Sequence, residues 1–279
     1  MAKIIDGKDL AKKIRDEVAA ESLTLTVKPH LAVVLVGDDP ASHTYVGMKE
    51  KACKAANVES SVHRLPSETT QTELMDLIDS LNNDRGVNGI LVQLPLPRHL
   101  DQNAVFGAVK REKDVDGFHP TNIGLMNLGF PEALIPCTPA GVMEMLKSID
   151  YPLKGKHVVV VGRSNVVGKP LSTLALLADA TVTTCHRHTI DLGHFTRQAD
   201  VLIVAVGKVN LVTADMVKPG AVVIDVGTNR VGDKLVGDVD YDAVAEVASY
   251  ITPVPGGVGP MTIALLLKNT VLAAKIQNG

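Results

Sequence analysis

The chain has 279 residues, 46% hydrophobic and 21% charged, a composition typical of a folded globular protein and not of a disordered or fibrous one. Its net charge of −3 argues against nucleic acid or an anionic membrane as the main partner, and no apolar run reaches membrane-spanning length. The length suits two domains better than one.

The three cysteines, Cys53, Cys137 and Cys185, are isolated and form no C-x-x-C pair. This pattern fits a reducing compartment and predicts neither a disulfide framework nor a metal site. The first residues carry scattered charges and no apolar core, so no secretory signal is expected. We therefore predict a cytoplasmic protein.

Helical and strand patterns alternate in the first half of the chain. We expect helices at 6–21, 41–56 and 70–83, and strands at 31–36, 59–65 and 89–92. This alternation predicts an α/β domain with a parallel sheet. From 93 to 136 the pattern loosens into loops, with one short helix expected near 101–110. Loops this long within a compact domain are usually functional.

The second half also alternates. We expect a helix at 139–148, strands at 157–161, 180–184, 201–206 and 221–226, and an apolar helix after Pro260 that returns to the first domain. The predicted division is therefore 1–138, completed by a helix at 261–279, and 139–260.

A strand–glycine turn–helix unit lies at 156–170. The run His157–Val161 reads as a buried parallel strand, Gly162 ends it, and Gly168 lies in the first turn of the next helix. The start of a helix after such a strand suits a phosphate. Because Ser164 replaces the second glycine of the dinucleotide fingerprint, an ordinary strand-to-helix turn remains an alternative.

The end of the following strand indicates which dinucleotide would bind. An NAD site normally offers a carboxylate there, but this chain has Cys-His-Arg-His-Thr at 185–189. Arg187, and Arg163 in the turn, would suit a 2′-phosphate, so NADP is favoured. The alternative is a solvated strand end. The spacing of His186 and His188 is too weak a pattern to predict a metal.

Three other segments in the first half could carry chemistry. Tyr45 and Lys49 lie four residues apart on a helix, near Ser42, and could offer a stacking surface with a proton carrier or be a plain surface pair. Gln93 follows a strand, where ligands bind in open α/β sheets. Asp116 either forms part of an Asp-Gly turn or supplies a carboxylate that pairs with an amide-like N–H edge.

Five sequence motifs together resemble those of one family, the bifunctional methylenetetrahydrofolate dehydrogenase/methenyltetrahydrofolate cyclohydrolases. The motifs are S-x-x-Y-V-x-x-K (42–49), VQLPLP (92–97), KDVDGFHP (113–120), GRSNVVGKP (162–170) and PVPGGVGPMT (253–262). The resemblance implies two α/β domains with parallel sheets that flank a cleft, the second a modified Rossmann domain, in a homodimer. It also implies NADP-dependent oxidation of 5,10-methylenetetrahydrofolate and hydrolysis of the product to 10-formyltetrahydrofolate, a one-carbon donor for purine biosynthesis.

The resemblance further implies roles for individual residues. Lys49 would be catalytic, Gln93 would hydrogen-bond to it, and Tyr45 would stack on the aminobenzoyl ring. Other substrate contacts would come from Ser42, Asp116, Pro253, Gly256, Gly257 and Val258, and cofactor contacts from Gly162, Arg163, Ser164, Gly168, Arg187 and Thr228. Arg187 departs from the family, because many members have serine there.

Two other classes of protein remain as alternatives. An NADP-linked oxidoreductase of the shikimate dehydrogenase type would share the architecture but would not need the Gln93 loop together with Tyr45 and Lys49. A non-catalytic nucleotide-binding module would not need the lysine.

Overall fold

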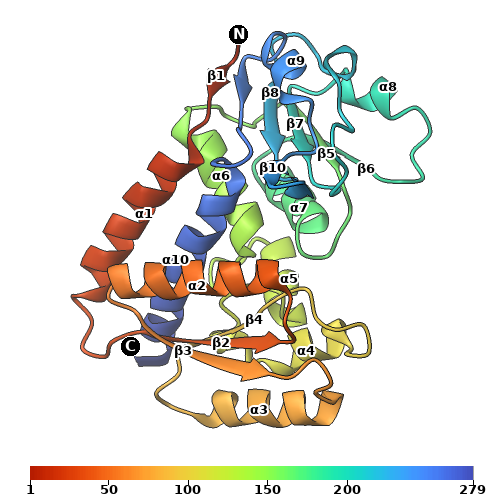
Figure 1. Ribbon diagram of the computed structural model, residues 1–279. Coiled ribbons are helices and arrows are strands. Elements are labelled where there is room, and N and C mark those ends of the chain that lie inside the picture. The colour runs from red at the N-terminus through yellow and green to blue at the C-terminus, as the bar shows by residue number, and fades with distance from the viewer. Residues whose placement is uncertain (279) are drawn as a thin grey trace. The chain divides into compact units, whose positions relative to one another are not determined.

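The computed structural model describes residues 1–278 and divides them into two compact units. The N-terminal unit comprises residues 12–137 and the described residues from Ile263 onward; the central unit comprises residues 1–11 and 138–262. Each unit contains a parallel β-sheet with helices, which confirms the predicted α/β class (Figure 1).

The sheet of the N-terminal unit has three parallel strands in the order β3 (Glu59–Leu65), β2 (His30–Val36) and β4 (Gly89–Val92). Helix α2 (Pro40–Ala55) lies on one side of this sheet and α3 (Gln71–Asn83) on the other (Figure 1). The remaining helical segments that lie wholly or mostly in this unit are α1 (Gly7–Ser22), α4 (Gln102–Ala108), η1 (Arg111–Lys113), α5 (Pro120–Asn127) and α10 (Val258–Asn278).

The alternation of side chains along β2 explains why helices cover both faces. Ala32, Val34 and Val36 pack in one apolar cluster with Leu74 and Ile78 of α3. The intervening residues of β2 are also buried and point to the opposite face. Helix α3 begins with the predicted capping box, in which Thr70 and Glu73 bond each other's backbone N–H groups.

The sheet of the central unit has six parallel strands. Their order is β1 (Lys3–Ile4), β11 (Tyr250–Ile251), β8 (Val222–Asp225), β7 (Val201–Val204), β5 (His157–Val161) and β6 (Thr181–Cys185). An antiparallel hairpin, β9 (Asn229–Val231) and β10 (Lys234–Val236), follows β8. The helical segments are α6 (Cys137–Ser148), α7 (Gly168–Leu177), α8 (Leu192–Thr196), η2 (Ala214–Met216) and α9 (Tyr241–Ala245). The central strands are buried on both faces, as their unbroken Val and Ile runs predict.

Two predictions about the chain path were wrong. Residues 1–11, which we placed in the first domain, lie in the central unit because the short strand β1 pairs with β11 at the edge of the six-stranded sheet. Residues 120–127, which we expected to be loop, form α5; Gly124 within it and its weak apolar periodicity concealed the helix.

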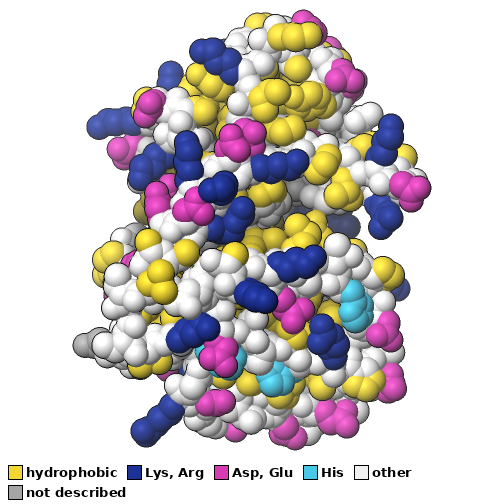
Figure 2. Space-filling model, turned by 60° about the vertical axis from the view of Figure 1, so that its left-hand side comes forward, with side chains coloured by type: hydrophobic (Ala, Val, Ile, Leu, Met, Phe, Trp, Pro, Cys, Tyr) yellow, Lys and Arg dark blue, Asp and Glu magenta, His cyan; other side chains and the backbone are white. Residues whose placement is uncertain are grey.

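The surface matches the near-neutral composition. On the face shown in Figure 2, Lys and Arg side chains are interspersed with Asp and Glu. Among residues 1–278, no helix is both long and apolar enough to cross a membrane.

Candidate functional site

Helix α2 presents the first group of candidate residues. Asp39 caps the helix by accepting hydrogen bonds from the backbone N–H and the hydroxyl of Ser42, each at 2.8 Å, and Pro40 occupies the first turn. Ser42 is therefore buried, and its hydroxyl proton is engaged within the cap. Tyr45, one turn later, is half-buried, and Lys49 lies a further turn along the same face.

Lys49 is buried, with 8% of its surface exposed, and its ammonium Nζ donates to Gln93 Oε1 at 2.8 Å. Gln93 extends β4 by one residue, because its backbone N–H donates to Val34 O at 2.8 Å. Burial lowers the pKa of Lys49, and the nearby Asp116 carboxylate opposes this shift. The structure thus brings Lys49, Gln93 and Asp116 together; of these contacts, the resemblance implies only the one between Lys49 and Gln93.

Asp116 is half-buried and lies close to both Lys49 and Cys137. Burial raises the pKa of its carboxyl group, while the charge of Lys49 and the neighbouring Cys137 thiol lower it. The Asp-Gly turn of the alternative interpretation is also present. Gly117 has φ +78°, and a Cβ there would lie 2.5 Å from Pro136 N, so this position requires glycine.

A different carboxylate, Asp114, organises this turn. It is 5% exposed and accepts hydrogen bonds from the N–H groups of Gly117 (3.2 Å), Phe118 (3.1 Å) and His119 (2.7 Å) and from Asn122 Nδ2 (2.9 Å). Desolvation nevertheless raises its pKa to about 7. Because Asp114 makes the turn, the Asp116 carboxylate is free to face Lys49. The Asp-x-x-Gly spacing from 114 to 117 was the signal that could have identified Asp114 in the sequence.

Two residues that no sequence pattern indicated also support this loop. The Cys137 thiol donates to Val115 O at 3.3 Å, and burial, with the nearby Asp116 charge, raises the pKa of the thiol well above its usual value. From α10, Asn269 Nδ2 donates to the carbonyl oxygens of Val115 and Ile135, each at 2.9 Å. These hydrogen bonds fix the backbone of Val115, the residue before Asp116.

The second group of candidates lies at the carboxyl edge of the central sheet. Gly162 ends β5 with φ +132°, and a Cβ there would lie 2.3 Å from Ala205 O; a Cβ on Gly168 would lie 2.1 Å from Gly162 O. This turn therefore needs both glycines. Ser164 Oγ accepts from the N–H groups of Val167 (3.1 Å) and Gly168 (3.4 Å), and Arg163 is exposed.

Two further candidates project from the same edge. Arg187 follows β6 and is exposed, with its Nε donating to His188 Nε2 at 3.1 Å. Thr228, three residues beyond the end of β8, is exposed as well. A glycine cradle with two accessible guanidinium groups fits a phosphorylated dinucleotide.

The predicted substrate residues Pro253, Gly256, Gly257 and Val258 form a tight turn at the start of α10. Gly257 N donates to Pro253 O at 2.8 Å, and a Cβ on Gly7 would lie 1.8 Å from Gly257 O. This close backbone approach requires glycine at position 7. Within residues 1–278, no group of three or more His, Cys, Asp or Glu side chains could hold a metal ion.

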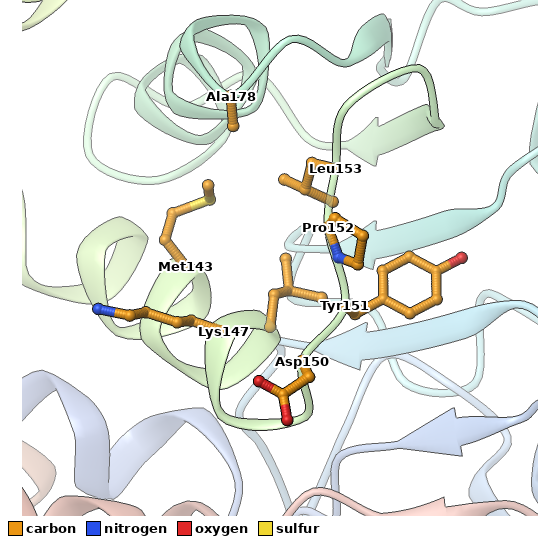
Figure 3. Close-up of a pocket in the computed structure, with 8 residues that line it drawn as sticks. Met143, Lys147, Asp150, Tyr151, Pro152, Leu153 and Ala178 are labelled. Carbon is orange, nitrogen blue, oxygen red and sulfur yellow. The ribbon is translucent and has the colours of Figure 1, made fainter.

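A hollow of about 460 Å³ lies elsewhere on the central unit (Figure 3). Met143 and Lys147 of α6 line it from one side, and Tyr151, Pro152 and Leu153 of the following loop line it from the other. None of the candidate residues above borders it.

Comparison with known families gives two matches. The catalytic-domain model of tetrahydrofolate dehydrogenase/cyclohydrolase matches residues 5–116, and the NAD(P)-binding-domain model of the same family matches residues 136–278. Among curated proteins, the chain is 57% identical to the bifunctional protein FolD of Exiguobacterium sibiricum, over 99% of this chain and 100% of that protein.

Solved structures agree. The bifunctional FolD methylenetetrahydrofolate dehydrogenase/cyclohydrolase of Campylobacter jejuni is 51% identical, with a TM-score of 0.97 over 99% of each chain. The enzyme of Trypanosoma brucei, solved with NADP and an inhibitor, is 38% identical, with a TM-score of 0.96 over 100% of this chain and 99% of that one. Shikimate dehydrogenase of Thermus thermophilus is 17% identical over 88% of this chain and 99% of that one, with a TM-score of 0.55, a likeness of fold alone.

Proposed function

The chain belongs to the tetrahydrofolate dehydrogenase/cyclohydrolase family and is a bifunctional enzyme of one-carbon metabolism, and we propose that NADP is its oxidant and Lys49 its proton carrier. The enzyme oxidises 5,10-methylenetetrahydrofolate to the methenyl form and hydrolyses this to 10-formyltetrahydrofolate. The observation that carries the proposal is the buried Lys49 hydrogen-bonded to Gln93 beside Asp116.

The two reactions make different demands on the protein. Bound NADP supplies a hydride acceptor for the methylene carbon, and the lone pairs of the two flanking folate nitrogens stabilise the resulting cation. That step transfers no proton, so the protein needs only to hold the methylene carbon in place. In hydrolysis, water adds to the methenyl carbon and loses a proton. When the bond from that carbon to the ring nitrogen breaks, the nitrogen gains a proton, and the hydroxyl of the adduct releases its own proton to solvent as the formyl C=O forms.

Lys49 suits the second reaction. Burial disfavours its charged form, so the neutral amine that can accept the proton of water is more accessible than in an exposed lysine. The ammonium formed can then give a proton to the leaving ring nitrogen. Gln93 Oε1 accepts from Nζ and fixes its direction, Tyr45 supplies a stacking surface, and Asp116 pairs with the N–H edge of the pterin.

NADP is supported by the exposed Arg163 and Arg187 and by the lack of an acid at 185–189, where an NAD site would place one. The Trypanosoma brucei relative was solved with NADP. We also propose that the enzyme is a cytoplasmic homodimer; the three cysteines are free, as in a reducing compartment, and light scattering on the purified chain tests the dimer.

Two assays test the proposed function. Protein mixed with methylenetetrahydrofolate and NADP should produce NADPH and a methenyl intermediate, and protein mixed with methenyltetrahydrofolate alone should consume it faster than buffer does. An enzyme that reduces NAD as efficiently as NADP would overturn the cofactor proposal and leave the folate chemistry intact.

A further inference from the structure

Two buried carboxylates meet at the carboxyl end of β8, and no step above uses them. Asp225 is the last residue of β8 and is 4% exposed; Asp238, between β10 and α9, is 0% exposed. An ionised carboxylate is stable at such depth only when it is well hydrogen-bonded.

Asp225 bonds the backbone on both sides of the hairpin. Its Oδ1 accepts from the N–H groups of Gly227 at 2.9 Å and Asp238 at 3.0 Å, and its Oδ2 accepts from Val239 N at 3.0 Å. The carboxylate therefore joins the segment that leaves β8 to the segment that returns from β10.

Asp238 bonds a second loop, the one that follows β7. Its Oδ2 accepts from the N–H groups of Val206 (2.7 Å) and Gly207 (2.9 Å), and its Oδ1 accepts from Lys208 N (2.8 Å) and from Asn229 Nδ2 (2.9 Å). Three successive N–H groups of one loop thus converge on a single side chain.

The surrounding glycines make room for these carboxylates. A Cβ on Gly237 would lie 1.8 Å from Asp225 Oδ2, and a Cβ on Gly227 would lie 2.2 Å from Asp238 Cγ. Real Cβ atoms do not approach other atoms so closely, so positions 227 and 237 must be glycine for the two carboxylates to take these places.

Both loops border the predicted cofactor residues. Thr228 lies between Gly227, which donates to Asp225, and Asn229, which donates to Asp238. Val206 directly follows Ala205, whose carbonyl oxygen occupies the space that a Cβ on Gly162 would need. Ligands of open α/β sheets bind at the carboxyl ends of the strands, which is where these loops lie.

We propose that Asp225 and Asp238 are positioning residues for the dinucleotide: they fix the loops after β7 and β8 in the shape that receives it. The proposal rests on the cofactor role assigned above to the central unit. We call the hydrogen bonds that Asp225 and Asp238 accept from these loops the carboxylate clamp. Breaking the clamp should weaken cofactor binding and spare hydrolysis, because hydrolysis uses Lys49 of the other unit and no dinucleotide.

The test is Asp238→Asn, which keeps the size of the side chain but turns an NH₂ donor toward backbone N–H groups. We expect the Kd of NADP, measured by calorimetry, to rise about 10- to 100-fold, as for the loss of one or two hydrogen bonds to a charged group. The hydrolysis of methenyltetrahydrofolate without cofactor should stay within about twofold of the wild type. If Asp238→Asn does not fold, as judged by circular dichroism, Asn229→Ala removes one donor to Asp238 and should raise the Kd several-fold.

Asp200→Asn is a matched control in the same unit. Asp200 also accepts a backbone N–H, that of His157 at 2.9 Å, but it lies before β7, at the amino edge of the sheet. The Asp200→Asn variant should leave the Kd of NADP unchanged. The proposal would be overturned by an unchanged Kd in the Asp238 and Asn229 variants, or by an equal rise of Kd in the Asp200 and Asp238 variants. A wild type that binds NAD and not NADP would overturn the choice of cofactor only, and the same variants would then be measured with NAD.

Discussion

The preference for NADP can be tested at Arg187, which follows β6 and is exposed to solvent. If its guanidinium binds the 2′-phosphate, Arg187→Gln removes one charge-assisted contact. Such contacts contribute about 1.5–3 kcal/mol, and the lower value applies here because water screens an exposed charge. We therefore expect NADP to bind about tenfold more weakly.

Arg187→Glu goes further, because it places a negative charge near the phosphate. Two unit charges 4 Å apart in water repel by about 1 kcal/mol, which adds roughly another fivefold. NAD has no 2′-phosphate, so its affinity should change by less than about threefold in both variants. The loss for NADP should also shrink as the salt concentration rises.

The assay is the Kd of each dinucleotide for the wild type and both variants. Lys154→Glu is the control: it makes the same change of charge in the exposed loop before β5, at the opposite edge of the sheet, and should not discriminate between the dinucleotides. Equal losses of NAD and NADP in Arg187→Glu would show that Arg187 is only a solvated strand end.

Two further predictions concern the loop after η1. Asp116→Ala should raise the KM for the folate substrate in both reactions and leave the Kd of NADP unchanged; unaltered folate kinetics would assign Asp116 to the turn alone. For Asp114, a folded-state pKa of about 7 against 3.8 means that the folded protein holds the proton more tightly, so its contribution to stability should fall as the pH rises from about 4 to 7. Chemical denaturation of wild type and Asp114→Asn at several pH values measures this, and a wild-type advantage that grows with pH would contradict it.

The sequence predicted most of the fold because its main elements have strong local signals. The runs Leu31–Val36 and His157–Val161 are apolar and β-branched, which is typical of strands buried on both faces, and both form such strands. Thr70 and Glu73 form the capping box that their spacing predicts. Strands β1 and β11 have two residues each, too few for any pattern, and their pairing decides where residues 1–11 lie.

The candidate site was less predictable, because its supporting residues act through the path of the chain. Asp114 and Asp116 are two residues apart, and only the folded loop reveals that Asp114 makes the turn while Asp116 faces Lys49. Asn269 contacts Val115 across 154 residues of sequence. Asp238 likewise looks like an ordinary acid in the sequence, and its proposed role depends on hydrogen bonds with the loop after β7 and with Asp225 at the end of β8.

The central claim is that Lys49 moves protons in hydrolysis but is not required to do so in oxidation. Lys49→Gln tests it, because an amide can still donate a hydrogen bond to Gln93 but cannot take up and return a proton at neutral pH. Lys54→Gln, an exposed lysine of the same helix, is the control.

The decisive measurement compares the two rates in Lys49→Gln, with methenyltetrahydrofolate supplied for hydrolysis and methylenetetrahydrofolate with NADP supplied for oxidation. We predict that hydrolysis falls by about 10²–10⁴-fold, as is typical of lost acid–base catalysis, while oxidation is partly retained. A fall of both rates by the same factor would show that Lys49 positions the substrate or supports the fold, and that another group moves the proton.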